Sequence, residues 1–280
     1  MPKKYLSKST FIKGVQCHKS LYLHKYHSNL SDDINAQQQA IFDRGTSVGE
    51  LAQQLFPGGV DASPKDYTKY FESFKYTQEL IKQGVPVIYE AGFCFDNVMC
   101  FIDILVNENG RWHAYEVKSS TKVTDTYVID ASLQYYIIQK TGLDIADISI
   151  VHINNTYIRC GTLDLKKLFS SVLVTRDAIN NNNYIKNKLL KLHNVLAQNS
   201  IPNVDIGPHC TMPYDCSFMG YCWKHIPNYS VFNLSRLNKQ IKWNLYEKGF
   251  ITLGQIPLDT NLSDNQKIEI DAYINQTEII

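Results

Sequence analysis

The stretch that decides the fold is residues 101–120, FIDILVNENGRWHAYEVKSS. Both of its halves are rich in Val, Ile, Phe and Tyr, and the turn sequence NENG separates them. This pattern predicts a hairpin of two strands, at 99–106 and 111–118. A third segment of the same character, 86–94, precedes them and predicts a further strand.

Helical patterns surround these strands. Helices are expected at 8–26, 36–55 and 65–83 before the strands, and at 127–141 after them. Two more strands are expected at 147–152 and 156–160. A long helical region follows at 165–198, either continuous or broken at 180–183. This order predicts an α/β fold, a mixed sheet flanked by helices. A domain over 1–226 and a small helical appendage over 227–280 are expected.

The composition limits which cellular compartment and which binding partners are expected. The chain has 280 residues with a formal net charge of +1, but its first 31 residues contain lysines and no acidic residue. This basic end suits a phosphate backbone or is a solvated helix face. The sequence has neither an apolar run long enough to span a membrane nor a signal peptide. A cytoplasmic protein is expected, where seven cysteines favour a metal site or buried thiols over disulfides.

Three residues of the hairpin form a catalytic pattern. Glu116 and Lys118 are two apart on one strand, so their side chains share a face, and Asp103 lies on the neighbouring strand. Two carboxylates at one place are expected to hold Mg²⁺ or Mn²⁺. Lys118 would then orient a water or stabilise the transition state. The alternative for Glu116 and Lys118 is a surface ion pair, but Asp103 stands in an apolar context that makes its burial costly without a partner.

The helix after the hairpin adds polar groups to this site. Gln134 can hydrogen-bond a phosphate or a water, unless it is simple helix surface. Tyr135 and Tyr136 can stack on bases or belong to the core. Asp130 is on the same helix.

The segments IDIL, YEVKSS and ASLQYY together resemble the PD-(D/E)XK nuclease superfamily, in its RecB-like branch. The resemblance implies a restriction-endonuclease-like nuclease core within 1–226. It implies that Asp103 and Glu116 bind the metal, that the backbone carbonyl of Val117 also touches it, that Lys118 is catalytic and that Gln134 reaches the site.

The chain departs from the RecB-like pattern at two places. In Arg44-Gly45-Thr46-Ser47-Val48-Gly49-Glu50, Gly49 stands where relatives carry a metal-binding histidine, and Glu50 is expected to supply a replacement carboxylate or to be plain helix surface. Ile138 stands where a tyrosine often follows the glutamine. Glu90 is a lesser candidate for the same cleft.

Four cysteines form a second pattern. Cys210, Cys216 and Cys222 are spaced C-x5-C-x5-C, and Cys17 lies far upstream. Structural zinc sites usually contain a C-x2-4-C pair, which this set lacks. The layout resembles the iron–sulfur nucleases of AddB type and the CRISPR spacer-adaptation nucleases. It implies a [4Fe–4S] cluster that ties the ends of the nuclease domain together, with zinc or unligated thiols as the alternatives.

The function expected from these patterns is a metal-dependent DNA exonuclease that acts on single-stranded or unwound DNA in repair, recombination or defence. Lys13, Lys19, Arg44, Tyr135 and Tyr136 are expected to contact the DNA. The alternative is a catalytically weak iron–sulfur module that binds nucleic acid with a partner protein. The chain also resembles the front half of an uncharacterised bacterial family, so a helicase or repair partner, or a missing C-terminal exonuclease-like domain, is expected.

Overall fold

The computed structural model of the chain describes residues 5–66, 69–257 and 259–277. The chain forms two compact units. The first consists of residues 1–26 and 33–202, and the second of residues 27–32 and 203–280.

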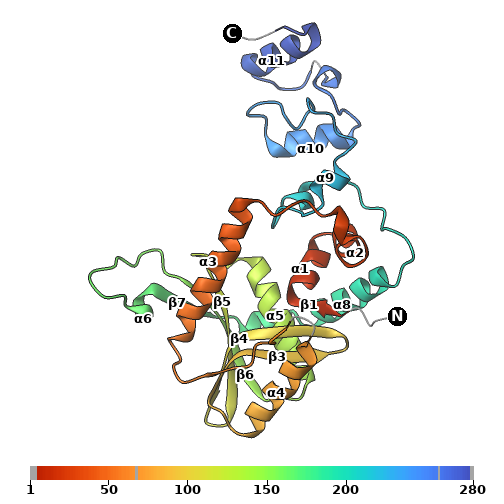
Figure 1. The fold of residues 1–280 in the computed structure, drawn as a ribbon. Coiled ribbons are helices and arrows are strands. Elements are labelled where there is room, and N and C mark those ends of the chain that lie inside the picture. The colour runs from red at the N-terminus through yellow and green to blue at the C-terminus, as the bar shows by residue number, and fades with distance from the viewer. Residues whose placement is uncertain (1–4, 67–68, 258, 278–280) are drawn as a thin grey trace. The chain divides into compact units, whose positions relative to one another are not determined.

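The first unit is built on one mixed sheet (Figure 1). Its strands run in the order β2 (Val60–Asp61), β3 (Val87–Phe95), β4 (Val98–Glu108), β5 (Arg111–Lys118), β6 (Ile145–Ile153) and β7 (Phe169–Leu173), and β1 (Leu6–Ser7) pairs with β4. The predicted hairpin is β4 and β5, which are antiparallel, whereas β5 and β6 are parallel and joined through α5 (Asp125–Lys140). The predicted fold class, a mixed sheet flanked by helices, is confirmed.

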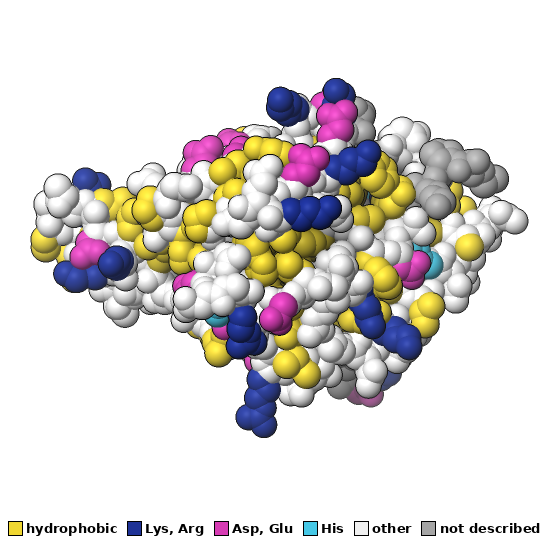
Figure 2. Space-filling model, turned by 90° about the horizontal axis from the view of Figure 1, so that it is seen from below, with side chains coloured by type: hydrophobic (Ala, Val, Ile, Leu, Met, Phe, Trp, Pro, Cys, Tyr) yellow, Lys and Arg dark blue, Asp and Glu magenta, His cyan; other side chains and the backbone are white. Residues whose placement is uncertain are grey.

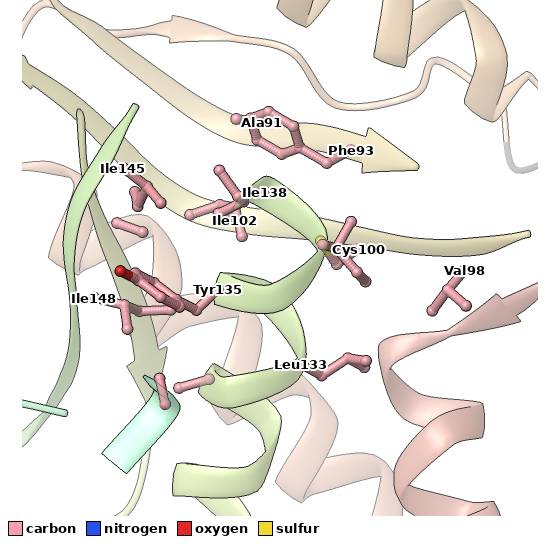
Figure 3. Close-up of a cluster of buried hydrophobic side chains, with 14 of the residues drawn as sticks. Ala91, Phe93, Val98, Cys100, Ile102, Leu133, Tyr135, Ile138, Ile145 and Ile148 are labelled. Atoms are coloured by element: carbon pink, nitrogen blue, oxygen red, sulfur yellow. The ribbon is translucent and has the colours of Figure 1, made fainter. Parts of the chain in front are cut away.

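Helices cover both faces of this sheet. On one face, α5 packs with α1 (Lys8–Gln16), α2 (His18–Tyr26) and α8 (Asn182–Leu196) over the larger hydrophobic core, which Figure 3 shows around Leu133 and Ile138. On the other face, α3 (Ala36–Gln53) packs over a smaller cluster. The helix α4 (Tyr70–Lys82) lies beside β3.

On strands β3 and β4, the alternation of side chains between the two faces of the sheet shifts by one residue at the same place. On β4, Ile102 and Leu105 belong to the larger core and Ile104 to the smaller cluster, so the alternation shifts by one residue at Asp103. On β3 the same shift occurs at Glu90, whose φ is +51°. The register pairs Tyr89 with Ile104 and resumes two residues further on, so Glu90 and Asp103 stand opposite each other. The irregularity therefore lies where two of the predicted carboxylates are.

Three of the predicted elements of the first unit differ from the structure. The expected helix at 8–26 is two helices, because Cys17 has extended backbone angles (φ −156°, ψ 120°). The expected strand at 156–160 is absent, and the helical region at 165–198 is α6 (Leu165–Leu168), β7, α7 (Thr175–Asn180) and α8. Residues 169–173 form a strand because they pair with the open edge of β6, and this tertiary pairing overrides local helical preference.

The second unit is helical. It contains the helices α9 (Met219–Cys222), α10 (Lys239–Glu247) and α11 (Asp264–Asn275) and the short 3-10 turns η1 (Ser28–Leu30), η2 (Pro208–Cys210) and η3 (Leu253–Gln255). The longer segment of this unit starts at residue 203, whereas the expected domain boundary is at residue 227. The reason is that Ile206, Cys210 and Trp223 pack against Trp243 of α10, so the cysteine segment folds with the tail. Among the helices described, none has the length and apolarity needed to cross a membrane.

Candidate functional site

Strand β5 presents Glu116 and Lys118 to α5. The Glu116 side chain is only 2% exposed. Its Oε2 accepts a hydrogen bond of 2.8 Å from Gln134 Nε2, and its Oε1 accepts one of 2.6 Å from Lys118 Nζ. The structure thus brings these three predicted residues together, on the face that strand alternation gives them.

Two residues that were not predicted as site residues complete this group. Lys118 Nζ also donates to Asp130 Oδ2 of α5 at 2.5 Å. Lys8 Nζ, at the first position of α1, donates to Glu116 Oε1 at 2.7 Å. Asp130 is one turn before Gln134 on α5, so its position on the same helix face was a usable signal. Lys8 lies 108 residues before its partner, and no local pattern connects the two.

Asp103 enters the group through the backbone of β5. Its Oδ2 accepts a hydrogen bond of 2.6 Å from the backbone N–H of Val117. The β4–β5 register ends at Ile104 and Tyr115, so a side chain replaces the ladder at this point. The bond orients the Asp103 carboxylate toward the same place as Glu116, and the charge of Glu116 affects the ionisation of Asp103.

Burial and crowding raise the pKa of two carboxyl groups. Burial, together with the charge of Glu116, raises the pKa of Asp103 to about 7. Burial and the charge of Asp103 raise the pKa of Glu90 to about 8. Burial alone would also raise the pKa of Glu116, but Lys118 and Lys8 hold it well below its usual range. Glu116 is therefore the permanent anion of the group, and Asp103 and Glu90 titrate near neutral pH.

Acidic groups outnumber basic ones here. The carboxyl groups that interact with the ammonium groups of Lys8 or Lys118 are Glu90, Asp103, Glu116 and Asp130. With all four carboxylates ionised, the group carries two uncompensated negative charges, which matches one divalent cation. Hard carboxylate oxygens are the ligands that Mg²⁺ and Mn²⁺ prefer, so the donor set fits these ions.

The arrangement of the carboxylates is set by their present partners. Within the described residues, no group of three or more His, Cys, Asp or Glu side chains stands in a geometry that could hold a metal ion. Glu116 is engaged at both oxygens, and Asp103 at one. An ion that bound Oε1 of Glu116 would take the place of a lysine.

The structure does not bring Glu50 and Arg44 to this group. Both are exposed on α3. This helix packs through Val48, Leu51 and Ala52 on the smaller cluster, on the face of the sheet opposite to Glu116. The expectation that Glu50 replaces the family histidine therefore has no geometric support in the described residues.

Tyr135 is not where DNA could reach it. Its side chain is 3% exposed and lies in the larger core near Ile148, as Figure 3 shows. The prediction that Tyr135 stacks on bases is wrong, because its position on α5 faces the sheet. Tyr136 is half-buried beside this core, with Lys140 Nζ 5.5 Å from its ring centroid, and its role stays a prediction.

The basic residues expected to contact DNA lie on different elements. Lys13 and Lys19 are half-buried on α1 and α2, and Arg44 is on α3. On the face that Figure 2 shows, lysine and arginine side chains are mixed with aspartate and glutamate, and they do not gather into one basic patch. The DNA contacts of these residues stay predictions.

Three of the four predicted cluster ligands lie in the second unit and Cys17 in the first. Burial raises the pKa of the Cys210 thiol, and hydrogen bonds from the backbone of Gly207 and from the side chain of Trp223 act in the opposite direction. The buried Nε1 of Trp223 has no other acceptor among the described residues. A thiolate accepts such hydrogen bonds more strongly than a neutral thiol does, so the residues fit a thiolate-bound group. The four-cysteine site itself stays a prediction.

The comparisons with known proteins give no family. No protein-family model matches the sequence, and no curated protein matches it. Among solved structures, the crystal structure of SSO0001 is similar over 78% of this chain and 86% of that chain, with 9% sequence identity and a TM-score of 0.39. A similarity of this size carries no information on function, which is inferred below from the site.

Proposed function

We propose that this chain is a metal-dependent DNA nuclease of the RecB-like branch of the PD-(D/E)XK superfamily. The observation that supports this proposal most is the environment of Glu116. A carboxylate that is 2% exposed receives the catalytic-type lysine Lys118 and the helix glutamine Gln134 on its two oxygens, beside Asp103. An ordinary surface ion pair would need neither burial nor a third partner.

Lys118 acts as a fixed cation in this proposal. Burial would lower its pKa, but Glu116 and Asp130 raise it, so it stays protonated at physiological pH. A protonated lysine stabilises the negative charge that develops on a phosphate in the transition state and does not serve as a base. Gln134 keeps Glu116 oriented, since it holds Oε2.

Asp103 and Glu116 would hold Mg²⁺ or Mn²⁺, with the carbonyl of Val117 as the further ligand. When bound, the ion supplies Lewis-acid catalysis and a more acidic water. Asp103 is already oriented for this role by the Val117 N–H, and its proton must leave before it can act as a ligand.

We propose single-stranded or unwound DNA as the substrate and an exonuclease as the mode of action. The support is the basic start of the chain, with Lys13 and Lys19, and the half-buried ring of Tyr136. Binding that neutralises phosphates should weaken roughly tenfold or more between low and physiological salt. A titration of labelled single-stranded and duplex oligonucleotides at two salt concentrations tests this substrate.

The test of the function is a cleavage assay. Labelled single-stranded DNA is incubated with Mn²⁺ and with wild type, Lys118→Met or Lys82→Met. Lys82 is an exposed lysine of α4 in the same unit and serves as the matched control. Lys118→Met should slow cleavage by about 100-fold or more, and Lys82→Met should not change it. Equal cleavage by wild type and Lys118→Met would exclude the proposed mechanism.

A second candidate, an iron–sulfur module that binds nucleic acid with little catalysis, is favoured by one observation. Gly49 stands at the position of the family histidine, and the adjacent Glu50 is exposed on the face opposite to Glu116. The ion would then have fewer protein ligands than in relatives. Tight DNA binding without Mn²⁺-dependent cleavage would favour this candidate.

The proposal includes a [4Fe–4S] cluster on Cys17, Cys210, Cys216 and Cys222 and a cytoplasmic location. The support is the cysteine spacing and the hydrogen bond from Trp223 that favours the thiolate form of Cys210. A repair or defence partner, such as a helicase, fits an exonuclease that needs unwound DNA.

A further inference from the structure

Lys8 is a second lysine on the oxygen that Lys118 already contacts. Its Nζ is 2.7 Å from Glu116 Oε1, and Lys118 Nζ is 2.6 Å from the same atom. A carboxylate oxygen has two lone pairs, and the two ammonium groups use both. The second oxygen, Oε2, is held by Gln134. Oε1 of Glu116 therefore has no acceptor site left for a cation while both lysines are in place, and Gln134 takes one of the two sites on Oε2.

The two lysines are not equally well anchored. Lys118 Nζ also donates to Asp130 Oδ2 and lies 5.1 Å from the ring centroid of Tyr127. For Lys8, Glu116 is the one hydrogen-bond acceptor within the part of the chain that the structure describes. The Lys8 side chain is also the more exposed of the two, at 26% against 17%. Since like charges at one oxygen repel each other, Lys8 is the lysine that leaves more easily.

The helix that contains Lys8 does not stabilise the positive charge of its side chain. Lys8 is the first residue of α1, which Ser7 caps, and a positive side chain at this end opposes the helix dipole. The first turn contains no acidic residue. Strand β1 pairs Leu6 with Val98 of β4 and so fixes the start of α1 beside the sheet. The charge of Lys8 is thus stabilised by Glu116, which is the largest contributor, and by Asp130 and Asp103, and not by its own helix.

We propose that Lys8 is the resident counter-cation of Glu116 and that a divalent cation must displace it in order to bind Oε1. This inference rests on the proposed metal site and adds a positioning residue to it. Without the ion, Lys8 keeps the buried carboxylate neutralised and oriented. With the ion, Lys8 swings toward solvent while Asp130 retains Lys118. The cost of displacing Lys8 weakens the affinity for the metal.

The first test measures Mn²⁺ affinity without DNA, by the electron paramagnetic resonance signal of free Mn²⁺. Lys8→Met should bind Mn²⁺ about tenfold more tightly than wild type, because one charge-assisted hydrogen bond no longer has to be broken. Lys8→Arg should return the affinity toward that of wild type, and Lys82→Met should leave it unchanged. Glu116→Gln should lose the site. A lysine with a merely structural role would give weaker or equal binding in Lys8→Met, and this result would overturn the inference.

The second test uses wild type and does not depend on the folding of a variant. Lysines are acetylated with a limiting reagent, with and without Mn²⁺, and mass spectrometry reports each site. Modification of Lys8 should rise when Mn²⁺ is present, and that of Lys82 should not. An unchanged Lys8 signal under saturating Mn²⁺ would overturn the inference.

Neither test involves cleavage, so a failure of the Lys8 displacement can be distinguished from a failure of the proposed nuclease function. Tighter Mn²⁺ binding by Lys8→Met in a protein that does not cut DNA supports the displacement and rejects the nuclease. Mn²⁺-dependent cleavage by wild type with unchanged affinity in Lys8→Met supports the nuclease and rejects the displacement.

Discussion

Two substitutions in the carboxylate group should change the stability of the metal-free protein in opposite directions. Glu116→Gln removes the anion that two ammonium groups contact. Asp103→Asn removes a charge that Glu116 disfavours, while the amide oxygen of the asparagine can still accept the hydrogen bond from Val117. The two side chains are neighbours with the same charge, so only their partners distinguish them.

For Glu116→Gln the loss follows from its bonds. Each hydrogen bond to a charged group contributes about 1.5–3 kcal/mol, and removal of one partner from a buried ion pair typically costs about 3–5 kcal/mol. Lys118 keeps Asp130 as a partner, and Lys8 can turn toward solvent. The expected loss in the free energy of unfolding is therefore at the low end, about 3 kcal/mol.

For Asp103→Asn the gain follows from the raised pKa. The pKa of Asp103 in the folded protein is about 7, against an ordinary value of 3.8. Each unit corresponds to about 1.4 kcal/mol, so the upper bound for the cost of this carboxyl group is about 4 kcal/mol. Relaxation of the site and entry of water reduce this cost, and the expected gain is about 1–2 kcal/mol at pH 8.

The pH dependence of the stability difference between Asp103→Asn and wild type is the control for this prediction. A folded pKa above the unfolded one means that the wild type loses stability as the pH rises from about 4 through 7. The advantage of Asp103→Asn should thus be small at pH 5 and larger at pH 8. Urea denaturation with EDTA at both pH values measures it. An Asp103→Asn protein that is less stable than wild type at pH 8, or an advantage that does not grow with pH, would refute the reasoning.

Three further predictions concern the neighbouring groups. The affinity for Mn²⁺ should rise between pH 6 and 8.5, because Asp103 and Glu90, with pKa values of about 7 and 8, must lose their protons first; titration calorimetry at several pH values checks this, and a flat profile contradicts it. Gln134→Leu should lower the free energy of unfolding by about 1–3 kcal/mol, because it leaves the buried Oε2 of Glu116 without a donor; an unchanged denaturation midpoint would show that this bond is not needed. Cys216→Ala should lose the iron and the visible absorption of anaerobically purified protein, and a colourless wild type would exclude the iron–sulfur cluster.

The sequence predicted most of the sheet because its signals there are local. The hairpin of β4 and β5 follows from apolar segments around a turn, and the shared face of Glu116 and Lys118 follows from strand alternation. The position of Gln134 was predicted from the family resemblance, and the structure brings it to Glu116.

The parts that the sequence did not predict depend on contacts between distant residues. Lys8 reaches Glu116 only because β1 joins the sheet beside β4, and a two-residue strand has no recognisable pattern. Residues 169–173 become β7 because the edge of β6 is open to them. Tyr135 and Tyr136 are adjacent, and only the packing of α5 decides which one enters the core.

The cleavage rate of Asp103→Asn tests the central claim most directly. This variant keeps its hydrogen bond to Val117 and should be more stable than wild type, so unfolding cannot explain a loss of activity. With saturating Mn²⁺ and labelled single-stranded DNA, the account predicts cleavage by wild type and a loss of about 100-fold or more in Asp103→Asn. Cleavage by Asp103→Asn at the rate of wild type would contradict the assignment of the metal site.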